Sequence, residues 1–181
     1  SEFLWDAASI IKSEIEMMLA DGVNYIQIDG PRYSYFLDPK WQHFLRQDMG
    51  IDPNDALQEA IAVDNYCFSD LGNHHATIAL HVCRGNHRSQ WYAEGSYEPI
   101  AERLFNELNV GAFLLEYDCD RAGTFEPLRF VPRNKRVVLG LVSSKFPALE
   151  TQREVTQRIE EASRYLPLEN LALSPQCGFA S

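Results

Sequence analysis

The 181-residue sequence predicts an α/β fold built on a parallel sheet, for three reasons. Short apolar runs alternate with stretches of helical periodicity, and parallel neighbours need such crossover segments. The runs are apolar almost throughout, as expected of strands covered on both faces. Several runs end in a polar residue, which is typical of enzymes built on α/β barrels. We expect one domain, residues 1–181, because this length suits a single hydrophobic core.

Helices are indicated where apolar residues recur at intervals of three and four. The first expected helix covers residues 5–20 and stops before Gly22. Further helices are expected at residues 40–47, 53–68 and 97–108. The last, residues 152–166, opens with Thr151 and Glu154 at the spacing of a capping box.

Five strands are expected between these helices, at residues 23–29, 76–83, 111–118, 136–144 and 171–177. None is followed by the glycine-rich turn of a dinucleotide-binding fold. The order of elements fits an open doubly wound sheet or part of a (β/α)₈ barrel. A complete barrel has eight strands and usually about 250 residues, so five strands would form only part of one.

The net charge of −10 argues against nucleic acid and anionic membranes as partners, because both attract basic surfaces. No apolar run approaches the roughly 20 residues that cross a bilayer. The first residues lack the pattern of a signal peptide. The four cysteines form no recognisable disulfide framework. We therefore expect a cytoplasmic protein.

Four residues near the ends of strands can supply metal ligands. His81 and Cys83 are two positions apart, so in a strand they point to the same face. Glu116 and Cys177 follow later apolar runs. One nitrogen, one oxygen and two sulfur ligands suit zinc. Single histidines and cysteines are also common in cores, whereas Glu116 is costly to bury unpaired. Spacing alone leaves both interpretations open.

Seven segments make the chain resemble the catalytic barrel of the cobalamin-independent methionine synthases: YIQIDGP, HVCRGN, LLEYD, RAGTFEPL, VLGLVSSKFPALE, RIEEASRYLP and LALSPQCGF. That family lies in a zinc-dependent methyltransferase superfamily that also includes uroporphyrinogen decarboxylase. The resemblance implies a (β/α)₈ TIM-barrel type, of which this chain covers about strands 4 to 8. It also implies that His81, Cys83, Glu116 and Cys177 bind catalytic zinc.

The resemblance further implies that Asp29 contacts the amino group of a thiol substrate. The chain departs from the family at two positions. Gly30 replaces a glutamate, and our alignment puts Val142 where the family's seventh strand ends in a histidine. These departures leave both the methyl donor, of folate or corrinoid type, and the thiol acceptor open.

The predicted function is zinc-dependent activation of a homocysteine-type thiol for alkyl transfer, as in methionine biosynthesis. Zinc keeps a bound sulfur deprotonated, and Glu116 is the ligand expected to loosen when the substrate sulfur arrives. We assign catalytic roles to Asp29 and Glu116, and substrate contacts to Asp29, Asn86 and Ser143. Asp118 and Arg121 are expected to pair with each other.

Two alternatives remain open from the sequence. One is an incomplete barrel with a structural or vestigial zinc site and no methyl transfer, and the other is a lyase or decarboxylase on the same scaffold. Because a partial barrel exposes strand edges, we expect the chain to require the missing N-terminal strands or to associate with itself.

Overall fold

The computed structural model describes residues 2–72 and 74–178. Its centre is a five-stranded sheet in the order β1-β2-β3-β4-β5, and every neighbouring pair is parallel. The strands are β1 (Tyr25–Asp29), β2 (Thr77–Val82), β3 (Ala112–Glu116), β4 (Arg136–Val142) and β5 (Leu171–Pro175). In a doubly wound sheet the strand order reverses at a switch point. Here it follows the chain without reversal, which is the arrangement of a barrel.

All five expected helices are present. They are α1 (Glu2–Ala20), α2 (Pro39–Gln47), α3 (Pro53–Cys67), α4 (Ala101–Glu107) and α5 (Gln152–Ala162). Helix α4 is shorter than predicted, because Ile100 caps it without helical geometry and Leu108 is already extended. Helix α5 also ends early, because the N–H groups of Arg164 and Tyr165 bond to carbonyls three residues back.

Side chains fix the starts of three helices. Asp38 and Asp52 each accept a hydrogen bond from a backbone N–H of the first turn, and a proline follows each of them. The predicted capping box is confirmed, since Thr151 and Glu154 satisfy each other's backbone N–H groups.

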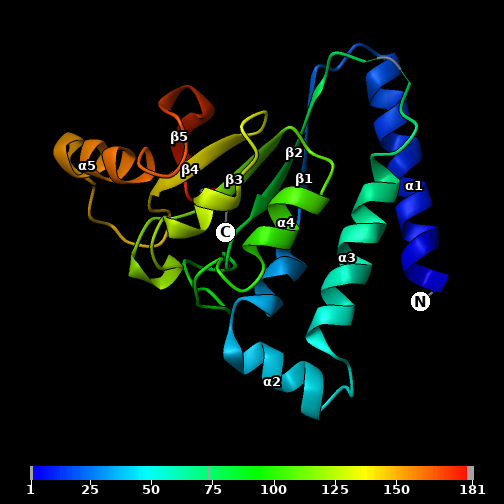
Figure 1. Cartoon of the computed structure of the whole chain (residues 1–181), viewed down its shortest axis with the longest axis horizontal. Coiled ribbons are helices and arrows are strands. Elements are labelled where there is room, and N and C mark those ends of the chain that lie inside the picture. Colours follow the sequence, from blue (N-terminus) through cyan, green and yellow to red (C-terminus); the bar gives the residue numbers. More distant parts are fainter. Residues whose placement is uncertain (1, 73, 179–181) are drawn as a thin grey trace.

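The two faces of the sheet differ. Alternate strand residues on one face, such as Leu80, Phe113 and Leu139, are fully buried in the hydrophobic core. The helices pack on this side, with α1 and α3 side by side near β1 and β2, and α5 against β4 (Figure 1). The other face carries Gln27 and Asp29, which are exposed. In a barrel this second face lines the interior.

The two edges of the sheet carry exposed apolar side chains. Tyr25 in β1 is 47% exposed and Leu173 in β5 is 49% exposed. Helix α1 adds Phe3 and Ile10, which are 77% and 66% exposed. Within the described residues, no helix is both long enough and apolar enough to span a membrane.

Candidate metal centre

Three predicted ligands meet at the carboxyl end of the sheet. His81 lies in β2, Cys83 directly follows that strand, and Cys177 follows β5. The imidazole nitrogen and the two sulfur atoms lie within 4.8 Å of one another. A tetrahedral zinc with bonds of ~2.0–2.3 Å separates its ligand atoms by roughly 3.5 Å. Small side-chain rotations would therefore bring all three atoms onto one ion.

Asp29 supports the histidine of this group. Asp29 and His81 are register partners in the β1–β2 pair, and His81 Nδ1 lies 2.9 Å from Asp29 Oδ1. A carboxylate on one ring nitrogen orients the other nitrogen toward a metal, as in many zinc sites. Burial opposes the charged form of His81, but hydrogen bonds with Cys177 and Asp29 outweigh it and raise its pKa to about 9.

The two thiols of the group are coupled. A hydrogen bond from Cys177 lowers the pKa of Cys83 to about 7. The same bond raises the pKa of Cys177 to about 12. One member of the pair is thus readily present as a thiolate, the form of cysteine that binds metal.

Glu116, the fourth predicted ligand, lies outside this group among the described residues. Its side chain is fully buried at the end of β3. Arg121 donates two hydrogen bonds to Oε1, at 3.0 and 2.8 Å. The backbone N–H of Arg84 and the amide of Gln176 donate to Oε2, at 2.9 and 2.8 Å. Lys145 Nζ lies 3.6 Å from Oε2.

These cations control the ionisation of Glu116. Burial acts to raise the pKa of its carboxyl group, but the charges of Arg84, Lys145 and Arg121 outweigh burial and lower that pKa. Glu116 is therefore held as a buried carboxylate.

Arg84 and Tyr97 fix the ends of β2 and β3 relative to each other. The fully buried guanidinium of Arg84 donates to the carbonyl of Gly95, to Tyr97 Oη and to the carbonyl of Glu116. Tyr97 Oη donates to the carbonyl of Val82 at 2.8 Å and accepts from the N–H of Glu116 at 2.9 Å. This network holds the strand ends that carry Cys83 and Glu116.

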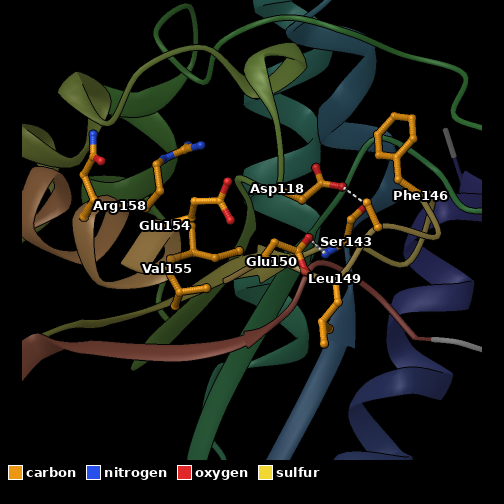
Figure 2. Close-up of a pocket in the computed structure, with 11 residues that line it drawn as sticks. Asp118, Ser143, Phe146, Leu149, Glu150, Glu154, Val155 and Arg158 are labelled. Carbon is orange, nitrogen blue, oxygen red and sulfur yellow. Dashed lines mark hydrogen bonds between the residues drawn. The ribbon is translucent and has the colours of Figure 1, made fainter. Parts of the chain in front are cut away.

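The predicted substrate contacts Asn86 and Ser143 each donate a hydrogen bond to another part of the chain. Asn86 Nδ2 donates to the carbonyl of Gly178 at 2.8 Å, next to Cys177. The hydroxyl of Ser143 donates to Asp118 at 2.7 Å. Ser143 and Asp118 line a cavity of about 480 Å³ between the segment after β4 and helix α5, and their side chains point toward each other there (Figure 2).

A second, smaller cavity lies beside the candidate ligands. It has a volume of about 250 Å³, and Asp29, His81, Cys177 and Gly140 are among its lining residues. This cavity opens on the barrel-interior face of the sheet and offers space for a small substrate next to the three ligand atoms.

Sequence reasoning missed the residues that surround Glu116. Lys145, Arg84 and Gln176 each follow an apolar strand, so the strand-end rule that selected Ser143 applied to them equally. Arg121 was expected to pair with Asp118, and its Nη2 does lie 2.9 Å from Asp118 Oδ1. Val142 ends β4 and is half-buried.

The fold and the site together define a class: an α/β protein of the TIM-barrel type with a His–Cys–Cys group at the carboxyl ends of its strands. The family model for the catalytic domain of the cobalamin-independent synthases matches residues 1–181. The chain therefore belongs to this family, and the fold prediction is confirmed.

Similar sequences and solved structures are consistent with this family assignment. The chain is 41% identical over 181 residues to the uncharacterized protein YxjH of Bacillus subtilis, and the match covers 99% of this chain and 48% of that protein. It is 26% identical to a methionine synthase of Pyrococcus horikoshii, and this match covers 97% of this chain and 43% of that protein. The putative vitamin-B12-independent methionine synthase of Listeria monocytogenes superposes with a TM-score of 0.72 at 30% identity, covering 98% of this chain and 49% of that one.

A B12-independent methionine synthase of Shewanella sp., solved in complex with selenomethionine, has the same fold. It superposes with a TM-score of 0.70 at 23% identity, covering 97% of this chain and 47% of that one. The chain thus spans about half the length of the curated relatives it matches.

Proposed function

We propose that this chain forms the zinc-binding half of a methyltransferase that activates a homocysteine-type thiol. The observation that carries the proposal is the convergence of His81, Cys83 and Cys177 within 4.8 Å, with Asp29 bonded to the histidine. This donor set fits zinc, because imidazole and thiolate are its preferred ligands. Glu116 is proposed as an exchangeable fourth ligand, which must first leave its present hydrogen-bond partners.

Zinc bound by these residues would lower the pKa of a coordinated substrate thiol and hold the sulfur as a thiolate. His81, Cys83 and Cys177 would hold this zinc and thereby set where a reacting sulfur could bind. Asp29 is 71% exposed and uses Oδ1 for His81, so Oδ2 is open to an ammonium group of the substrate. The thiol proton leaves to solvent. The sulfur–carbon bond would then form as the donor's bond to the methyl group breaks and the donor keeps the electron pair. A folate-type donor would also take up a proton, whereas a corrinoid-type donor would not.

The methyl donor is proposed to be of folate or corrinoid type, as a partner of the complete barrel. We also propose that the exposed interior face is covered in the functional protein, either by the N-terminal barrel strands or by a second copy of the chain. A cytoplasmic location is consistent with the free cysteines at the site.

Metal analysis tests the zinc centre directly. Protein purified without chelator should contain about one zinc per chain, as expected of a structural or catalytic site, and Cys177→Ala should lose most of it. Cys119→Ala is the matched control, because Cys119 lies outside the ligand group, and it should retain the metal. A wild-type protein without zinc would contradict the proposal.

Thiol activation is tested separately, after replacing zinc with Co²⁺. Homocysteine should change the visible spectrum of the Co²⁺ protein, because a new sulfur ligand enters the coordination shell. A spectrum indifferent to thiols, in protein that still holds one metal ion, would instead favour the structural-zinc alternative.

A further inference from the structure

Glu116 lies in a cage of four residues, each from a different segment at the carboxyl end of the sheet. The cage consists of Arg84 after β2, Arg121 after β3, Lys145 after β4 and Gln176 after β5. Three of the four carry a positive charge. Two of these four segments, the ones after β2 and after β5, also carry the candidate ligands Cys83 and Cys177.

The cage uses the full hydrogen-bonding capacity of the carboxylate. Each carboxylate oxygen accepts about two hydrogen bonds. Oε1 receives both from Arg121, and Oε2 receives one from Arg84 and one from Gln176. In this arrangement Glu116 has no lone pair to offer a metal ion, and ligation would require it to break at least one of these bonds.

Lys145 is the exception in the cage. Its side chain is fully buried and its Nζ has no hydrogen-bond partner within the described part of the chain. At 3.6 Å from Glu116 Oε2 it contributes charge rather than a directed bond. A buried ammonium without a hydrogen-bond partner is costly, so its position calls for an explanation beyond packing.

The position of Lys145 is well anchored. Its backbone N–H donates to the hydroxyl of Ser143 at 3.1 Å, and that hydroxyl is bonded to Asp118. Asp118 in turn pairs with Arg121, whose guanidinium lies 4.4 Å from the ring centre of Trp91. Ser143 therefore helps to hold the backbone of Lys145 in place.

We propose that Lys145 is a positioning residue that weakens the hold of Glu116 on the metal, so that the substrate thiol can displace it from the fourth coordination position. This inference rests on the proposed zinc-dependent function. Glu116 and the substrate sulfur compete for one position on the ion, and the charge of Lys145 shifts that competition toward the sulfur.

The proposal predicts that Lys145→Met changes the affinities for zinc and for homocysteine in opposite directions. Without the ammonium, Glu116 joins the metal more readily, so the zinc affinity should rise by about tenfold, the scale on which outer-shell partners act. Homocysteine must then displace a firmer ligand, so its affinity should fall by about tenfold. Lys145→Arg keeps the charge and should restore both values.

Zinc affinity is measured by competition with a chromophoric chelator, and homocysteine affinity by titration of the Co²⁺ protein. Lys135→Met is the matched control. Lys135 is also buried but lies just before β4, at the opposite end of the same strand, and donates to the carbonyls of Phe105 and Leu108. This variant should bind zinc and homocysteine like the wild type.

The decisive experiment combines Lys145→Met with Glu116→Gln in a double variant. If Lys145 acts through Glu116, adding Lys145→Met to Glu116→Gln should change neither affinity further. An effect of equal size in that background would overturn the proposal, because it would mean direct attraction between Lys145 and the thiolate.

Two other results would overturn it in the single variant. A fall in both affinities would indicate a merely structural role, and no change in either would mean that Lys145 does not influence Glu116. In both cases the wild type still binds zinc and homocysteine, so the proposed function stands. Failure of the wild type to bind zinc would overturn the proposed function and this inference together.

Discussion

Asp29 and His81 stand opposite each other in the β1–β2 ladder, and their side chains join at 2.9 Å between Oδ1 and Nδ1. The sequence assigned Asp29 to substrate and His81 to metal, as separate roles. Their hydrogen bond connects the two roles, because a carboxylate that orients a ligand histidine also lies beside whatever the metal binds.

Asp29→Asn should lower zinc affinity by about 10- to 100-fold, because the amide orients the imidazole less firmly than the carboxylate. Competition with a chromophoric chelator measures this change. Gln27→Ala is the control, since Gln27 lines the same cavity on the same strand. Unchanged zinc affinity in Asp29→Asn would show that the bond to His81 has no influence on the metal.

A second experiment isolates the substrate role of Asp29. The wild-type Co²⁺ protein should bind homocysteine about tenfold more tightly than a thiol of similar length without an amino group, the equivalent of one charge-assisted hydrogen bond. Asp29→Asn should remove this preference. If the preference survives in the variant, another group binds the ammonium.

The buried carboxylate of Glu116 should make stability depend on pH in the acid range. Its pKa is lowered in the folded chain, because the cations around it outweigh burial. A lowered pKa contributes stability that is present above the unfolded value of about 4.5 and lost as the pH falls through the folded value.

Glu116→Gln should therefore be less stable than the wild type by about 3 kcal/mol at pH 7, the cost of breaking a buried ion pair. The difference should shrink as the pH falls below about 4.5. Urea unfolding of metal-free protein at several pH values measures it. Glu126→Gln removes an exposed carboxylate and should show a small, nearly constant difference. A difference that does not vary with pH in Glu116→Gln would contradict this account.

Gly140 allows β4 and β5 to approach at the site. A Cβ atom there would lie 2.8 Å from the Cα of Gln176 and 3.0 Å from the carbonyl oxygen of Leu115. Gly140→Ala should therefore cost about 2 kcal/mol of unfolding free energy, a typical cost of overpacking. Because Cys177 follows Gln176, the variant should also retain less zinc.

Gly111→Ala is the control for crowding. The nearest atoms to its Cβ would lie at an ordinary 3.7 Å, at the opposite end of the sheet. Its thermal stability and zinc content should match the wild type within the error of the measurement. Equal effects of the two substitutions would mean that glycine as such, and not close approach at Gln176, determines the result.

The sequence predicted the elements well because each strand is an apolar run with clear limits. It predicted that His81 and Cys83 meet Cys177 because strand ends in a parallel sheet converge. The location of Ser143 follows from the alternation of the strand. In β4, Gly140 faces the interior beside Glu116. Leu141 and Ser143 alternate with Gly140, so they lie toward the opposite face of the sheet. Ser143 lines the cavity near α5.

The environment of Glu116 was beyond prediction from spacing. The four residues around it come from segments up to about 90 residues apart in the chain, from Arg84 to Gln176. Only the folded sheet brings these segments together. Sequence reasoning correctly required a partner for the buried carboxylate, but it could not decide between a metal ion and a set of cations.

The exposed apolar surface leads to a prediction about association. Tyr25 and Leu173 lie on the two edge strands, and Phe3 and Ile10 project from α1. Such surfaces favour contact with another chain. The 181 residues expressed alone should form dimers or larger species in analytical ultracentrifugation at micromolar concentration.

Phe3→Glu combined with Ile10→Glu should shift the distribution toward monomer, because both changes place charge on α1. Leu149→Glu alters an even more exposed residue beside the α5 cavity and should leave the distribution unchanged. A monodisperse species of 20.7 kDa in the wild type would contradict the prediction.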